Sequence, residues 1–102
     1  MSVQADYNQA EDKLTIRISG QFNYGVHQDF SNAYKELMPS DRRKYVIDLS
    51  SVEHIDSSAL GMLLLLKERA GGSRADITLQ GGSSAIKKIL DISGFKHLFK
   101  VI

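Results

Sequence analysis

The pattern of hydrophobic and polar positions along the chain predicts two strands, followed by helices that alternate with further strands. Apolar residues alternate with polar ones over residues 3–7 and 14–19, which is typical of half-buried strands. Residues 10–13 between them suit a hairpin turn. Residues 26–38 then carry apolar side chains at helical spacing, and Pro39 ends that helix.

The second half of the chain repeats a strand-then-helix pattern. Residues 44–49 are rich in β-branched and aromatic side chains and predict a short buried strand, followed by a polar connection at residues 50–53. A helix of about four turns begins at Ser57, give or take one residue, and ends before Gly71 and Gly72, which favour the left-handed conformation that follows a helix.

Three further elements complete the pattern. Residues 77–79 predict a strand and residues 99–102 another, and between them residues 84–91 predict a helix whose inward side chains are Ile86, Ile89 and Leu90. The order β-β-α-β-α-β-α-β predicts an α/β fold with a mixed, four- to five-stranded sheet covered by helices, because parallel neighbours need helical crossovers. We expect one domain over residues 1–102.

Apolar residues surround the helix that begins near Ser57, so some of them must face away from the core. We expect Leu60, Leu63 and Leu64 to face the sheet. Met62 and Leu65 then form an exposed patch that binds a partner, with Ser58 at its edge. The alternative, that neighbouring helices cover the surplus apolar residues, stays open.

The start of the same helix carries an acid and two hydroxyls. Asp56, Ser57 and Ser58 are all good N-cap residue types, and Asp56 is the expected cap. The first turn of a helix offers unpaired N–H groups and a partial positive charge, so an added anion is favoured there. Plain capping and phosphorylation of a serine are both consistent with this pattern, and they are compatible with each other.

Composition and charge exclude several classes of function. The chain has 102 residues, a net charge of +1 and no cysteine, so disulfides and thiolate metal sites are absent. Its one basic cluster, at residues 42–44, follows Asp41, and no basic stripe predicts nucleic-acid binding. The apolar run at residues 63–66 is far shorter than the ~20 residues that cross a bilayer, and we expect no signal peptide, because residues 1–6 have neither a basic start nor an apolar stretch. We therefore expect a cytoplasmic protein without membrane insertion.

Enzymatic motifs are missing as well. The sequence has no Gly-x-Ser-x-Gly elbow, and His27, His54 and His97 have no catalytic motif around them. Residues 81–84 lack the lysine and the spacing of a Walker phosphate loop, and they predict a turn from strand to helix. We expect no catalytic activity, no cofactor and no metal.

One motif gives a positive indication. Residues 56–61, Asp-Ser-Ser-Ala-Leu-Gly, follow a strand that ends in Asp48-Leu49, and they resemble the phosphorylation motif of the STAS domain family. Within that family the chain is most similar to bacterial anti-sigma factor antagonists. Residues 18–22 and 89–95 match in the same order, so the resemblance covers nearly the whole chain. It implies that Ser57, directly after the aspartate, is the phosphoacceptor and that Ser58 is its unmodified neighbour.

Two positions depart from the family pattern. Ala59 stands where glycine is frequent, and this change favours helix in the first turn. Asn23 stands where an acid is frequent, near the expected phosphoacceptor. A neutral Asn23 would repel an incoming phosphate less than an acid would.

The resemblance also implies a function. It predicts a regulatory binding protein that engages an anti-sigma factor, a serine kinase or another regulator while Ser57 is unmodified. A serine protein kinase and a serine phosphatase would then switch it. The alternative is an accessory subunit of a transporter complex with no phosphorylation switch, and a hydrolase using Ser57 or Ser58 ranks third.

Overall fold

The chain forms a five-stranded sheet with three α-helices, seen in a computed structural model that describes residues 2–36 and 43–102. The strands are β1 (Val3–Asn8), β2 (Lys13–Phe22), β3 (Lys44–Ile55), β4 (Asp76–Gln80) and β5 (Lys100–Val101). The helices are α1 (His27–Lys35), α2 (Ser57–Arg69) and α3 (Ser84–Ile92), with 3-10 turns η1 (Tyr24–Val26), η2 (Gly72–Arg74) and η3 (Phe95–His97).

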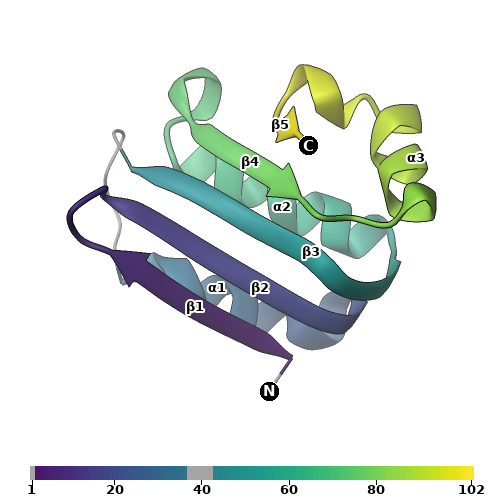
Figure 1. Ribbon diagram of the computed structural model, residues 1–102, viewed down its shortest axis with the longest axis horizontal. Coiled ribbons are helices and arrows are strands. Elements are labelled where there is room, and N and C mark those ends of the chain that lie inside the picture. Colours follow the sequence, from purple (N-terminus) through teal and green to yellow (C-terminus); the bar gives the residue numbers. More distant parts are fainter. Residues whose placement is uncertain (1, 37–42) are drawn as a thin grey trace.

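The sheet is mixed, as the sequence predicts. Its strand order is β1-β2-β3-β4-β5, and β1 and β2 form an antiparallel hairpin (Figure 1). Strands β2 to β5 run parallel, with a helix in each crossover. The predicted fold class and element order are confirmed. Because β2, β3 and β4 are parallel, their carboxyl ends point to the same edge of the sheet, where the segments leading to the helices begin.

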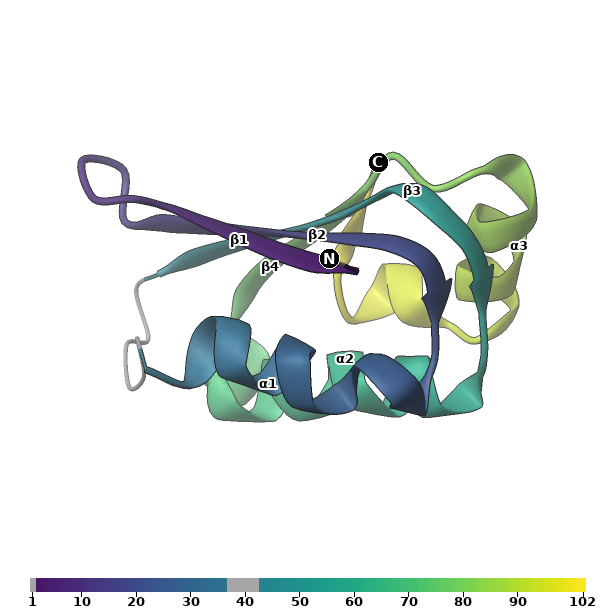
Figure 2. The same cartoon turned by 90° about the horizontal axis from the view of Figure 1, so that it is seen from below.

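Helices α1 and α2 lie side by side on one face of the sheet (Figure 2). Inward side chains of the strands meet the apolar faces of these helices in one core. The largest fully buried members are Leu14, Ile16, Ile18, Phe22, Phe30, Tyr34, Tyr45, Ile47, Leu49, Leu63, Leu66 and Leu79. Burial of these side chains, at about 25 cal/mol per Å² of apolar surface, is the main source of stability.

Strand β3 is longer than the sequence predicts. Residues 50–53, expected as a polar connection, continue the strand to Ile55 because Ser51 and Val52 pair with β2 and because Val52 is buried. The pairing shifts register twice, between Arg17 and Ser19 and again between Gly20 and Gln21. Such bulges bend strands. Figure 2 shows the ends of β2 and β3 curving toward the helix layer, which brings them to the starts of α1 and α2.

Two of the predicted helices differ in detail. The helix expected over residues 26–38 begins as η1 and continues as α1 to Lys35, while its expected last residues, 37–38, lie outside the described residues. Helix α3 agrees with its predicted bounds to within one residue, and Ile86 and Leu90 are buried as expected. The prediction for Ile89 is wrong, since it is 38% exposed. The inner face of this short helix is filled by the other two.

The turn between β4 and α3 depends on a glycine. Gly81 has a φ of +78°, and an added Cβ would lie 2.9 Å from the Ser50 Cβ. The same Cβ would lie 3.2 Å from an oxygen of Asp48, a buried carboxylate that also accepts hydrogen bonds from Ser50 and Arg17. Burial alone would raise the pKa of Asp48, but these donors outweigh it and hold the pKa below its ordinary value.

Candidate functional site

The predicted site lies where β2 and β3 end together. Phe22 and Ile55 are paired, and the Asp56 N–H donates to the Phe22 carbonyl over 3.4 Å. Asn23 and Asp56 are the residues that follow this pair on the two strands. The bulged, curved end of the β2–β3 pair therefore brings Asn23 beside the start of α2, although the two are far apart in sequence.

Asp56 caps α2, and the helix begins at Ser57 as predicted. The backbone of Asp56 is extended, and its Oδ1 accepts a hydrogen bond from the Ala59 N–H at 3.0 Å. The Ser58 hydroxyl donates to the same oxygen at 2.6 Å. The Ser58 hydroxyl, followed by the Ala59 N–H, holds the pKa of Asp56 below its ordinary value, so the cap is ionised at neutral pH.

The two adjacent serines have different surroundings. Ser58 is half-buried, and its hydroxyl is committed to Asp56. Ser57 is exposed, and within the part of the chain that the structure describes its hydroxyl makes no hydrogen bond. The structure thus places one bound and one accessible hydroxyl on the first two residues of α2.

Asn23 has a structural role of its own. Its Oδ1 accepts a hydrogen bond from the Gly25 N–H at 2.9 Å and so caps η1. The next residue, Tyr24, is 68% exposed and stacks on His27, with ring centroids 4.9 Å apart. Sequence reasoning missed Tyr24. Its signal would have been an aromatic residue directly after the polar residue that follows β2.

The exposed patch predicted on α2 is half right. Met62 is only 6% exposed, so its assignment to the patch is wrong, whereas Leu65 is 39% exposed as expected. Leu64, predicted to face the core, is 41% exposed, and Leu60 is partly buried against the core. The inner face consists instead of Ala59, Met62, Leu63 and Leu66. A run of five apolar residues has no helical period, so it could not fix the rotation of the helix.

The outer face of α2 carries both the accessible Ser57 and the exposed Leu64 and Leu65. Gly61, Leu64 and Leu65 lie four, seven and eight residues after Ser57, which places all of them on one side of a helix. All four are exposed. We call this set the outer stripe of α2. Leu64 also lines a hollow between α2 and η3, together with Lys67, Glu68, Gly72, Ser73, Ala75, His97 and Leu98.

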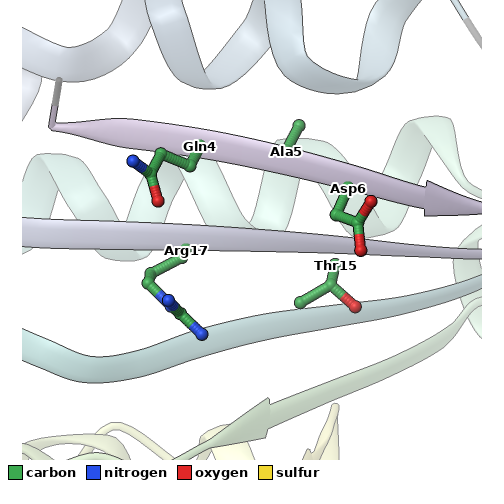
Figure 3. A pocket seen from close by; sticks show the side chains of 5 residues that line it. All are labelled: Gln4, Ala5, Asp6, Thr15 and Arg17. Carbon is green, nitrogen blue, oxygen red and sulfur yellow. The ribbon is translucent and has the colours of Figure 1, made fainter.

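A second hollow lies on the hairpin, away from this site. The side chains of Gln4, Asp6, Thr15 and Arg17 share the face of β1 and β2 that points away from the helices, and Ala5, between Gln4 and Asp6 on β1, points to the other face (Figure 3). Arg17 also reaches Asp48, with 3.1 Å between Nε and Oδ2. The hollow is shallow and polar, and no sequence motif falls on it.

Two further properties bear on chemistry. Within residues 2–36 and 43–102, no group of three or more His, Asp or Glu side chains could hold a metal ion. No helix among these residues is long and apolar enough to cross a membrane.

The chain has clear relatives among known proteins. A STAS-domain containing protein of Pseudomonas aeruginosa (strain UCBPP-PA14) is 52% identical over 89 residues, which cover 87% of each chain. The anti-sigma factor antagonist SpoIIAA in its unphosphorylated form has the same fold, with a TM-score of 0.75 at 13% identity over 98% of this chain and 86% of that one. The phosphorylated form of SpoIIAA from Bacillus superposes with a TM-score of 0.65 at 15% identity, covering 98% and 90%.

A sulfate transporter family protein of Wolinella succinogenes also shares the fold. Its TM-score is 0.71 at 18% identity, covering 95% of this chain and 82% of that one. The family model described as "Mlab, STAS domain" matches residues 5–101, nearly the whole sequence. The order of the elements, the Asp56–Ser57 start of α2 and these relatives agree, and the chain belongs to the STAS domain family.

Proposed function

We propose that this protein is a phosphorylation-controlled binding switch of the anti-sigma factor antagonist type. In its unmodified form it binds a regulator, either an anti-sigma factor or a serine kinase. A serine protein kinase modifies Ser57 and so weakens or redirects that binding, and a serine phosphatase restores the first state. The switch operates in the cytoplasm, where the kinase finds its nucleoside triphosphate.

The observation that carries this proposal is the exposure of Ser57 on the first residue of α2. Its hydroxyl stands directly after an ionised cap and is accessible to another protein. A phosphate at a helix start meets a favourable field worth about 0.3–1 kcal/mol, so the fold tolerates the modification. The protein can then change its binding without unfolding.

The outer stripe of α2 supplies the surface that the phosphate controls. Leu64 and Leu65 expose apolar area on the same side of the helix as Ser57, and the exposed Gly61 lies between them. A phosphoserine carries a charge of about −1.5 to −2 at neutral pH. Its hydration shell would have to be removed at the edge of an apolar interface, which costs binding free energy. Leu65 therefore keeps its expected role in partner binding, and Leu64 replaces Met62.

Relatives support the same direction. SpoIIAA is an anti-sigma factor antagonist that exists in unphosphorylated and phosphorylated forms, and its fold is that of this chain. Asn23, beside the start of α2, carries no charge that would oppose a phosphate on Ser57. We propose that Asn23 shapes the edge of the partner surface and takes no part in charge recognition.

Binding, and not catalysis, is the proposed activity. Among the described side chains His27 stacks on Tyr24, and neither His54 nor His97 makes a hydrogen bond to a serine. A serine nucleophile needs a base within hydrogen-bond reach. Ser58 has only the Asp56 carboxylate, whose lowered pKa makes it a weak base.

A second candidate function is an accessory subunit of a transporter complex without a phosphorylation switch. The shared fold with a sulfate transporter family protein favours it. In that case the outer stripe of α2 would contact the transporter permanently. Ser57 would then remain unmodified under every growth condition, which separates the two functions by one measurement.

The test is phosphopeptide mapping of the protein recovered from growing cells. We expect phosphate on Ser57 in a fraction of the molecules and none after the substitution Ser57→Ala. The matched control is Ser84→Ala, because Ser84 is also an exposed serine on the first residue of a helix. A Ser57→Ala protein that still carries the full amount of phosphate would contradict the proposal.

A further inference from the structure

Two adjacent serines could accept the phosphate in the proposed switch, and their hydroxyls differ in hydrogen bonding. Ser58 Oγ lies 2.6 Å from Asp56 Oδ1, a short distance typical of a hydroxyl that donates to a carboxylate. That carboxylate is itself fixed, because the Ala59 N–H donates to the same oxygen at 3.0 Å. Ser57, one residue earlier, is exposed and has no such bond within the described chain.

We propose that Asp56 determines which serine is modified, by holding the Ser58 hydroxyl in the helix cap and leaving Ser57 as the acceptor. This inference rests on the proposed function and adds a specificity-determining role for Asp56. The cap residue would then both start the helix and select the modified residue.

The chemistry of the transfer explains why the bond matters. The acceptor oxygen bonds to the γ-phosphorus of a nucleoside triphosphate while the bond to the bridging oxygen breaks. The nucleoside diphosphate leaves, and the hydroxyl proton passes to a base of the kinase. Ser58 would have to leave the cap and turn its proton away from Asp56 before any of this occurs. Ser57 needs no such rearrangement.

Asp56 does not instead activate Ser58. A carboxylate whose pKa is lowered by its hydrogen bonds is a poorer base than an ordinary aspartate. Its negative charge, 2.6 Å from Ser58 Oγ, also repels the γ-phosphate that would approach that oxygen. Both effects act against Ser58.

The decisive experiment compares three variants expressed in the native cells, with fragment-ion mapping that separates phosphate on Ser57 from phosphate on Ser58. They are Ser57→Ala, Asp56→Gly and the double variant. Glycine is a tolerated N-cap residue that has no side chain to hold Ser58. Amide spectra of each variant check that α2 still forms, and phosphate on Ser84 measures the background at a helix start that has no acid.

In Ser57→Ala, where the cap is intact, we expect phosphate on Ser58 to be no higher than the background on Ser84. In the double variant phosphate on Ser58 should rise by about tenfold or more, because a hydrogen bond to a charged group no longer holds the hydroxyl. Asp56→Gly alone should keep phosphate on Ser57 and gain some on Ser58.

Three results would overturn the inference about Asp56 without removing the proposed phosphorylation switch. The first is phosphate on Ser58 well above the Ser84 background in Ser57→Ala. The second is an unmodified Ser58 in the double variant when Asp56→Gly is still modified on Ser57. The third is loss of all phosphate in Asp56→Gly, which would make Asp56 a recognition residue for the kinase. A wild-type protein without phosphate on either serine would remove the proposed function and this inference together.

Discussion

Helices α2 and α3 begin in nearly the same way and differ in what surrounds their first serine. Each follows a parallel strand, each has a side-chain cap, and each has an exposed serine as its first residue, Ser57 or Ser84. The cap of α2 is the carboxylate of Asp56, whereas the cap of α3 is the Ser83 hydroxyl, which accepts from the Ile86 N–H at 3.2 Å. A serine at a helix start is therefore a common structural feature and does not by itself define a switch.

The outer faces of the two helices separate them further. Four and eight residues after Ser57 lie Gly61 and Leu65, whereas the same steps from Ser84 lead to Lys88 and Ile92, with Asp91 beside Ile92. A phosphate on Ser57 would border an apolar surface, and one on Ser84 would border a charged one. Under the proposed function, control of binding requires an accessible hydroxyl and an apolar surface in the same place, and only α2 of these two helices combines them.

The largest expected effect is on stability, and it should be similar for the buried faces of α2 and α3. Met62 in α2 and Leu90 in α3 are buried, so Met62→Lys and Leu90→Lys should each lower the free energy of unfolding by about 3 kcal/mol or more. Urea denaturation followed by circular dichroism measures this. A Met62→Lys protein as stable as the wild type would show that Met62 faces solvent after all.

The next effect concerns the outer faces, where α2 and α3 should differ. Leu65→Lys should leave stability within about 0.5 kcal/mol and weaken binding to the regulator by about 2 kcal/mol or more. The matched variant is Ile89→Lys, because Ile89 is 38% exposed and Leu65 is 39% exposed. Titration calorimetry with the purified kinase or anti-sigma factor gives both affinities. Equal losses of binding free energy in the two variants would show that the outer faces of α2 and α3 do not differ in partner binding.

A smaller effect is a difference in pH dependence between the two helix caps, Asp56 of α2 and Ser83 of α3. Asp56 has a lowered pKa in the folded protein, so its contribution to stability is present above its ordinary pKa and is lost as the pH falls through the folded value. Ser83 does not titrate, and Ser83→Ala should cost about 1 kcal/mol at any pH. Amide exchange of Ala59 and Ile86, followed below pH 5, should show protection falling at α2 and not at α3. Parallel losses at both amides would mean global acid unfolding.

The smallest effect is a gain. Gly61 is exposed within α2, and an added Cβ would meet no atom within 4 Å, so Gly61→Ala should stabilise the protein by about 0.5–1 kcal/mol. A shift of the urea midpoint measures it. Binding to the regulator should fall at the same time if the partner approaches the helix closely there. An unchanged affinity would place the contact nearer Leu64 and Leu65.

The sequence predicts those helix and strand bounds that are determined by neighbouring residues in the chain. The cap at Asp56 and the start of α2 at Ser57 were predicted because capping preferences act within one turn. The last residues of β3 were not, because Ser51 and Val52 have the pattern of a loop until they pair with β2. Pairing across a bulge is a tertiary event that no short pattern contains.

The candidate site shows the same division. Ser57, Ser58 and Asp56 could be named from one motif, and Asn23 was placed near them only through the family resemblance. The rotation of α2, which exchanged Met62 for Leu64, is set by packing against the sheet. The 2.6 Å bond between Ser58 and Asp56 depends on two side-chain rotamers, which residue types alone do not determine.

The strands differ in length, and this difference determines which part of β3 can lose its pairing locally. Beyond Asp48, β3 pairs with β2 alone, because β4 ends opposite that residue. Amides of the last part of β3 are therefore held by one neighbour, while those of Tyr45 to Asp48 have neighbours on both sides. Fraying is cheapest where a strand has a single partner. Asp56 and Ser57 directly follow such a segment, so the proposed acceptor can move locally while the central strands stay paired.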